Sequence, residues 1–179
     1  MRRLERIING ITISMLEIMV YDEEDIEELK GYRNETNLTL GMDMLPYLRY
    51  FEKADYLELT GGELGPDEYE PVYRVNPRAL VVNYDNTHIK DKKIDLAKCK
   101  RLEYLNVYLQ LNCTNYAKCS SLKTLFASYW HDCDLSALGD SQIDSLQIFR
   151  GKLISLAGIE RMKQLKVLVL DSLRNLRDI

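Results

Sequence analysis

Hydrophobic positions recur along this chain in a fixed pattern. Residues 95–107 (DLAKCKRLEYLNV) and 115–127 (NYAKCSSLKTLFA) match almost position by position, 20 residues apart. In both, apolar side chains stand three residues apart and then two apart, at relative positions −9, −6, −3, 0 and +2. A spacing of three suits a helical or 3₁₀ turn, and a spacing of two suits a strand with one buried face. Each stretch therefore predicts a short turn followed by a short strand.

The same pattern can be followed along the whole chain. Its position 0, the predicted strand centre, falls on residues 16, 38, 57, 82, 105, 125, 146 and 168. In the fourth unit, a frame centred on Leu80 is the alternative to Val82. Units of this size cannot bury their apolar edges alone, so neighbouring units must stack. We predict a single domain over residues 1–179 with about eight irregular repeats. The segment 60–77 is rich in glycine and proline and is predicted to be an inserted loop.

The spacing L-x-x-L-x-L resembles the leucine-rich repeat family. The clearest stretch, 156–179 (LAGIERMKQLKVLVLDSLRNLRDI), is similar to its 22-residue internalin-like class. The resemblance implies an α/β repeat fold, a leucine-rich repeat solenoid with parallel β-strands on the concave face and short helices or 3₁₀ turns on the convex side. The family's asparagine ladder is absent, so we expect an irregular solenoid.

Composition and charge narrow the class of protein. The hydrophobic fraction of 46% and the charged fraction of 29% are those of an ordinary globular chain. No apolar run approaches the ~18 residues of a membrane span, and the first residues lack the long apolar region of a secretory signal. We therefore expect a cytoplasmic protein that does not bind membranes.

The net charge of −4 is unevenly divided along the chain. Residues 1–89 hold 9 basic and 18 acidic residues, a balance of −9, whereas residues 90–179 hold 15 and 10, a balance of +5. Nucleic-acid binding needs a concentrated basic patch, and a pI near 5.3 argues against it.

The four cysteines follow the repeat. Cys99 and Cys119 share position −6, and Cys113 and Cys133 share position +8, so each pair is predicted to lie on adjacent units as small core residues. A disulfide within a pair, or a thiol or metal site near Cys113 and Cys133, is the alternative.

Other catalytic signals are weak. The chain has two histidines, no phosphate-binding glycine loop and no zinc-protease motif. We predict no enzyme activity, no catalytic residue, no metal site and no cofactor.

The strands should display a binding surface for a protein partner on the concave face of the sheet. Residues at −1, +1 and +3 point away from the core and include no Lys or Arg, but several aromatic residues among uncharged polar ones. Aromatic anchors in such surroundings are typical of protein-binding patches. The alternative is that these rings only pack on one another. The predicted partner-binding residues are Tyr56, Glu58, Asn83, Tyr104, Asn106, Tyr108, Phe126, Trp130, His131, Gln147 and Phe149.

These features predict a protein–protein interaction module, an intracellular adaptor or inhibitor, with a toxin-neutralising protein as one version by analogy. The alternative is an assembly subunit, or a fragment of a longer repeat protein. It would associate with itself or a partner through an open C-terminal edge, because the last strand is not followed by a polar cap.

Overall fold

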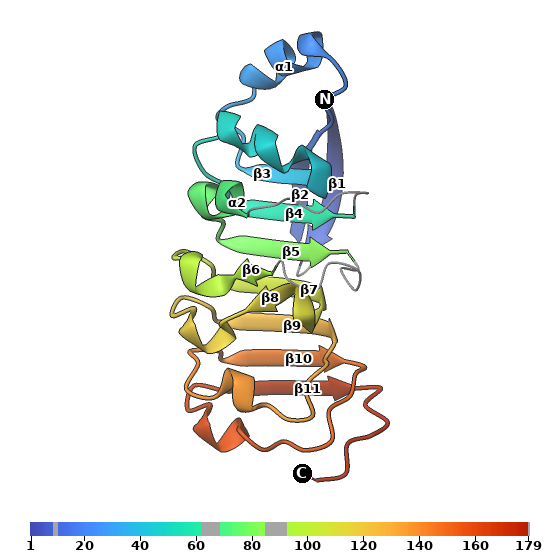
Figure 1. Cartoon of the computed structure of the whole chain (residues 1–179), viewed down its shortest axis with the longest axis vertical. Coiled ribbons are helices and arrows are strands. Elements are labelled where there is room, and N and C mark those ends of the chain that lie inside the picture. Colours follow the sequence, from blue (N-terminus) through green and yellow to red (C-terminus); the bar gives the residue numbers. More distant parts are fainter. Residues whose placement is uncertain (9–10, 62–68, 85–92, 179) are drawn as a thin grey trace.

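The computed structural model describes residues 1–8, 11–61, 69–84 and 93–178. It is an α/β fold with few helices and one large, mostly parallel sheet of nine strands (Figure 1). In spatial order these are β1 (Arg2–Ile8), β2 (Ile11–Ile18), β3 (Asn37–Gly41), β4 (Tyr56–Thr60), β5 (Ala79–Asn83), β7 (Tyr104–Leu109), β9 (Thr124–Tyr129), β10 (Ser145–Phe149) and β11 (Val167–Asp171). Only β1 and β2 pair antiparallel within this sheet. A second, two-stranded sheet joins β6 (Ile94–Asp95) to β8 (Cys113–Thr114).

Helical segments connect most of the parallel strands. They are α1 (Glu23–Lys30), α2 (Glu70–Val75) and the 3₁₀ helices η1 (Met42–Tyr50), η2 (Leu96–Lys98), η3 (Gln110–Asn112), η4 (Tyr116–Lys118), η5 (Ser136–Leu138) and η6 (Ile159–Arg161). In α1, Asp22 caps the helix by accepting a hydrogen bond from the Asp25 backbone N–H. The acidic residues that follow Asp22 lie in the first turn, where the helix dipole favours negative charge. No helix in the described part of the chain is long and apolar enough to cross a membrane.

The strand register places one leucine of each parallel strand in a continuous row. The row contains Leu16, Leu38, Leu57, Leu80, Leu105, Leu125, Leu146 and Leu168. Seven of these coincide with the predicted strand centres, and in the fourth unit the alternative frame at Leu80 holds instead of the centre placed at Val82. Leu80 and Val82 both face the core, so a shift of two residues preserves the hydrophobic pattern, and only the pairing with Leu57 and Leu105 selects Leu80.

The main core lies between the sheet and the helical segments. In the parallel strands other than β11, residues at positions 0 and +2, such as Leu57 and Leu59, are buried on one face of the sheet. Leu45 and Leu48 of η1 and Val72 of α2 belong to the same core. We call this side of the sheet the helical side.

The inserted loop predicted at 60–77 is partly a helix. Residues 62–68 lie outside the described residues, but Glu70–Val75 form α2. Pro71 stands in the first turn, where proline costs no helical hydrogen bond, and Val72 and Val75 are buried three residues apart. The proline that indicated a loop therefore begins a helix, and the loop prediction is wrong for this part.

The first predicted unit also differs from the pattern. Instead of a helical turn before the strand at Leu16, the chain forms an antiparallel hairpin of β1 and β2. β2 pairs with β3 only through Leu16, Glu17 and Ile18, so its earlier residues extend beyond the parallel sheet. This extension determines which part of the sheet surface stays open.

Candidate functional site

The face of the sheet opposite the helical side, which we call the outer face, has two different halves. The hairpin of β1 and β2 covers the N-terminal half, on β3 to β5, and Figure 1 shows β1 running across the direction of these strands. On β7, β9, β10 and β11, the outer-face side chains are half-buried or exposed. We call these the covered half and the open half.

The covered half contains a second, smaller hydrophobic cluster. Met15 of the hairpin, Tyr56 of β4 and Val81 of β5 are buried together, with Ile13 and Ala79 packed against them. Ile13 and Met15 lie on the same side of β2, since side chains in a strand alternate. Burial raises the pKa of Tyr56 well above its ordinary value, because the ionised phenolate would lose its water.

A buried carboxylate lies beside this cluster. Glu58 accepts hydrogen bonds from Thr39 Oγ1 at 3.1 Å and from Arg6 Nε at 3.3 Å. Arg6 pairs with Ile13 in the hairpin, so its side chain lies on the side of the hairpin that faces the sheet. The guanidinium and the hydroxyl together compensate the charge that burial would otherwise penalise.

Two predicted partner-binding residues therefore need correction. Tyr56 and Glu58 were expected on an open face, but each is only 6% exposed. The hydrophobic pattern of the sequence predicts the parallel strands, but it does not predict the antiparallel hairpin that folds over them. Tyr56 and Glu58 hold the hairpin on the sheet and are not available as a surface.

In the open half, aromatic side chains lie in contacting pairs. Phe126 of β9 and Phe149 of β10 stack with ring centroids 6.1 Å apart, and Tyr108 of β7 meets Tyr129 edge-on at 5.2 Å. Tyr108 and Phe149 are each 38% exposed, and Phe126 is half-buried. The rings thus pack on one another, as the alternative prediction held, while leaving part of their surface to solvent.

Polar residues and a second apolar group surround these rings. Asn106 and Gln147 are half-buried beside them, and Val169 of the last strand is exposed. Tyr104 packs partly against the covered cluster, which places it at the boundary of the two halves. Asn83 is exposed at the end of β5, at position +3 instead of the predicted +1, because the frame is centred on Leu80.

A cation next to the aromatic pairs was missed by the sequence analysis. Arg150 donates a hydrogen bond to the Tyr129 hydroxyl at 3.0 Å, and its guanidinium lies 5.9 Å from that ring's centroid. The hydrogen bond and the positive charge lower the pKa of Tyr129. Arg150 has a φ of 65°, so a left-handed turn after β10 sets its position, which strand periodicity cannot predict.

Trp130 is not a surface residue, so its prediction as a partner-binding residue is wrong. It is fully buried, packs near Tyr116 and donates its indole N–H to the Asp134 carbonyl at 3.0 Å. Its backbone forms a bridge with Gly151, whose φ is 135°. A Cβ at Gly151 would lie 2.3 Å from the Trp130 carbonyl oxygen, so only glycine fits this contact. His131, the next residue, is half-buried.

The cysteines divide differently from the prediction. Cys99, Cys113 and Cys119 are free and buried, whereas Cys133 is free and exposed. Burial raises the pKa of the Cys99 thiol to about 12, which keeps it protonated and unreactive near neutral pH. Core packing therefore fits three cysteines and is wrong for Cys133, whose segment 131–134 turns outward. Among the described residues, no three His, Cys, Asp or Glu side chains converge as metal ligands.

Neither protein-family models nor curated proteins nor solved structures match this chain. The open half of the outer face combines partly exposed rings, uncharged polar side chains and one arginine held against a tyrosine.

Proposed function

We propose that this chain is a leucine-rich repeat-like solenoid that binds a protein partner through the open half of its outer face. The observation that carries the proposal is the partly exposed aromatic cluster of Tyr108, Phe126 and Phe149. Exposed rings with restricted side-chain freedom are frequent binding anchors, because burying them removes a large apolar area from water at low entropic cost. Asn106 and Gln147 would supply hydrogen bonds at their margin.

The covered half gives an example, within the chain itself, of a segment that binds to the outer face. There the chain's own hairpin packs on the outer face through apolar side chains, and Arg6 completes the contact by pairing with Glu58. A partner segment could pack on the open half in the same way, with its apolar side chains against Phe126 and Phe149. Arg150, beside Tyr129, would donate hydrogen bonds to a partner carboxylate or carbonyl oxygen.

The regular leucine row and the helical turns behind it support the repeat part of the proposal. In this proposal, each irregular repeat contributes one of the eight parallel strands, which are β2 to β5, β7 and β9 to β11. The biological role that follows is a non-enzymatic adaptor or inhibitor, working in the cytoplasm without a cofactor. A toxin-neutralising protein is one version of that role by fold analogy.

The test is affinity capture from a lysate of the source organism, followed by mass spectrometry. Wild type is compared with the triple variant Tyr108→Asp, Phe126→Asp, Phe149→Asp, after circular dichroism has shown that both are folded. We expect a partner that wild type captures and that the variant loses by at least about tenfold, since each aspartate would have to be desolvated in the contact.

A matched control separates this surface from a general effect of charge. The variant Ser120→Asp, Ser136→Asp, Gln164→Asp adds the same three charges at exposed positions outside the outer face. It should retain the partner. If both triple variants retain the partner, or both lose it, the open half is not the binding surface.

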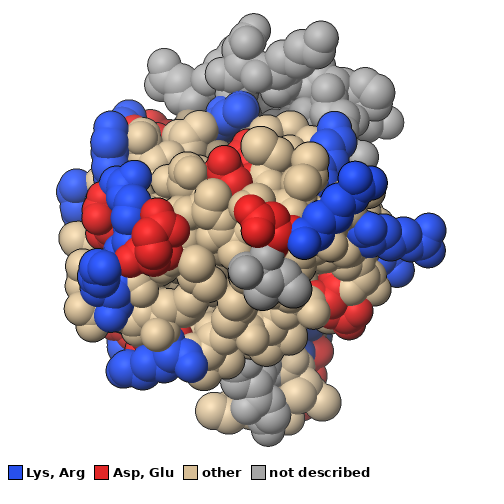
Figure 2. All heavy atoms as spheres, turned by 90° about the horizontal axis from the view of Figure 1, so that it is seen from below, with Lys and Arg blue, Asp and Glu red and all other residues tan. Residues whose placement is uncertain are grey.

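A second candidate function, assembly through the edge strand β11, rests on a separate observation. At positions 0 and +2 the other parallel strands are buried, but Leu168 and Leu170 of β11 are only partly buried. Figure 2 views this end of the molecule and shows a broad uncharged area between groups of Lys, Arg, Asp and Glu. An apolar strand edge of this kind can pair with another strand.

Light scattering on the purified chain tests this candidate. Assembly requires a dimer or larger species at micromolar concentration, and Leu170→Lys should return it to the monomer. A monomer at all concentrations would exclude self-assembly and would leave the open half as the proposed contact.

A further inference from the structure

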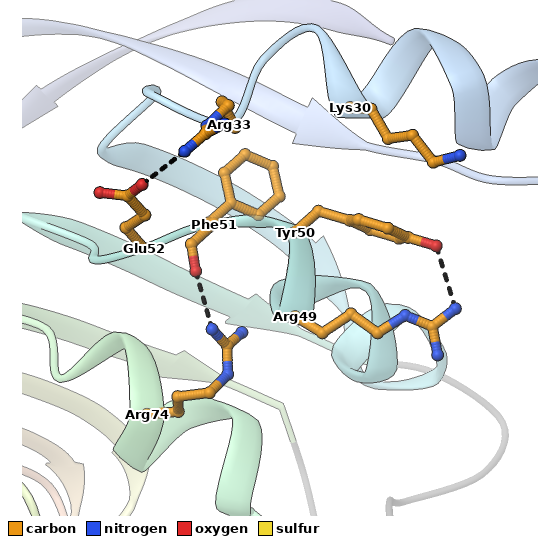
Figure 3. Close-up of a pocket in the computed structure, with 7 residues that line it drawn as sticks. All are labelled: Lys30, Arg33, Arg49, Tyr50, Phe51, Glu52 and Arg74. Carbon is orange, nitrogen blue, oxygen red and sulfur yellow. Dashed lines mark hydrogen bonds and ion pairs between the residues drawn. The ribbon is translucent and has the colours of Figure 1, made fainter.

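On the helical side, four basic side chains surround a hollow of about 380 Å³ (Figure 3). Lys30 ends α1, Arg33 follows it, Arg49 is near the end of η1, and Arg74 belongs to α2. They are four of the nine basic residues in 1–89, a region with a balance of −9. Cations thus gather at one place in the more acidic half of the chain.

Arg74 is held by backbone acceptors rather than by a carboxylate. Its guanidinium donates to the carbonyl oxygens of Leu48 and Phe51, the Phe51 bond being 2.9 Å long. These carbonyls lie at the C-terminal end of η1, where the Leu48 carbonyl also accepts the Phe51 backbone N–H. Arg74 therefore adds side-chain donors at the end of η1, and its positive charge is held at the hollow by backbone carbonyls.

Arg49 is positioned by an aromatic residue. It donates a hydrogen bond to the Tyr50 hydroxyl at 3.0 Å, and its guanidinium lies 5.0 Å from the centroid of the same ring. Both contacts restrict the side chain, since a cation is attracted to the face of an aromatic ring. Figure 3 shows the Lys30 ammonium on the other side of that hydroxyl.

The counter-charges at this hollow are incomplete. Lys30 pairs with Glu27, and Arg33 pairs with Glu52, which itself lines the hollow, at 2.8 Å; the side chains of both pairs are exposed to solvent. Within the described ranges, no carboxylate forms an ion pair with Arg49 or Arg74. Exposed ion pairs are weak and exchange readily with other anions, so Lys30 and Arg33 can turn toward a ligand, whereas Arg49 and Arg74 are already held at the hollow.

We propose that this hollow is a binding site for a phosphoryl group. Guanidinium groups match the oxygens of a phosphate with paired hydrogen bonds, and two of them are already held in place here. The volume exceeds that of one phosphate, which leaves room for the group that carries it. The carrier is either a free small phosphate compound or a phosphorylated segment of a protein. The site lies on the opposite side of the sheet from the proposed partner surface and does not depend on it.

Isothermal titration of the full chain tests the proposal with three probes: inorganic phosphate, a short phosphoserine peptide and the same peptide without phosphate. We expect saturable binding of at least one phosphorylated probe and none of the unphosphorylated peptide. Arg49→Gln should weaken that binding about tenfold, because it removes a held cation without removing a backbone cap. Arg74→Lys, which keeps the charge but loses the forked donors, should weaken it several-fold.

The matched control is Arg161→Gln, which removes one exposed arginine paired with Asp140 at the other end of the molecule. It should change the affinity less than about twofold. Equal affinity for phosphate and for the phosphopeptide would identify a free phosphate compound as the carrier, and tighter peptide binding a protein segment. Absence of saturable binding, or equal losses in Arg49→Gln and Arg161→Gln, would overturn the proposal.

Discussion

The two halves of the outer face are built from the same alternating strands, yet the side chains of one half are buried and those of the other are partly exposed to solvent. In the covered half, Tyr56 lies under the hairpin with Met15 and is almost wholly buried. In the open half, Tyr108 stands on the same face and is 38% exposed. Both are outward-facing tyrosines in the hydrophobic pattern. The pattern therefore determines the direction of a side chain, whereas exposure depends on what else the chain folds over it.

The difference also separates two uses of aromatic residues. Where the hairpin packs on the sheet, rings contribute to folding, and a polar link between Arg6 and Glu58 fixes the hairpin's place. Where nothing in the described chain covers the sheet, Phe126 and Phe149 bury only part of each other's surface. Rings of this second kind have the most apolar surface left to bury against a partner.

The strongest way to test this comparison is to truncate one tyrosine from each half. Tyr56→Ala should lower the free energy of unfolding by about 3 kcal/mol, because it leaves a cavity under the hairpin. Tyr108→Ala should lower it by about 1 kcal/mol, since Tyr108 is already 38% exposed in the folded chain and packs against the Tyr129 ring. Urea unfolding of both variants, monitored by circular dichroism, measures the difference.

Equal losses in the two variants would contradict the division into halves. The variant Tyr56→Phe serves as the control for shape, because it keeps the ring and removes only the hydroxyl. It should stay within about 1 kcal/mol of wild type.

A smaller effect is expected from the ion pairs of the hairpin. Arg6→Ala leaves the Glu58 carboxylate buried without its cation, which should cost about 1–2 kcal/mol, the arginine itself being partly exposed. Arg2→Ala removes an exposed arginine that pairs with the half-buried Glu17 of the same hairpin, and it should cost less than about 0.5 kcal/mol. The same unfolding experiment compares them.

The double variant Arg6→Ala, Glu58→Gln sharpens this test. Removing the charge that Arg6 compensates should recover part of the loss. If Arg6→Ala and Arg2→Ala cost the same, the carboxylate of Glu58 is hydrated in solution, and the hairpin does not cover it as described.

Much of the sheet could be predicted from the sequence because its cause is local. Spacings of three and two residues place Leu57 and Leu105 in the core without reference to any distant residue. The one error in the row, Val82 for Leu80, arose where two core positions fit equally well. Local periodicity cannot choose between them, because the choice is made by hydrogen bonding to β4 and β7.

The candidate site was harder to predict because its causes are not periodic. The burial of Tyr56 depends on a hairpin that is distant in the chain, in which Met15 pairs with Leu4 and packs on Tyr56. The burial of Trp130 depends on a glycine conformation at Gly151. These are a long-range contact and a single backbone angle, and neither leaves a repeated signal in the sequence.

The smallest predicted effect compares tyrosine ionisation in the two halves. Tyr129 should ionise below its ordinary pKa of 10.0, because the Arg150 hydrogen bond and charge favour the phenolate, and Arg150→Gln should move this ionisation upward. Folding stability linked to Tyr129 therefore rises as pH approaches 10 from below. Tyr56 has the opposite sign: the unfolded chain ionises near pH 10 while buried Tyr56 stays protonated, so the stability it contributes is lost above that pH. Ultraviolet titration of wild type, Tyr129→Phe and Tyr56→Phe separates these events. If the tyrosine ionisation at the lowest pH disappears in Tyr56→Phe instead of in Tyr129→Phe, the assignment of the covered and open halves is reversed.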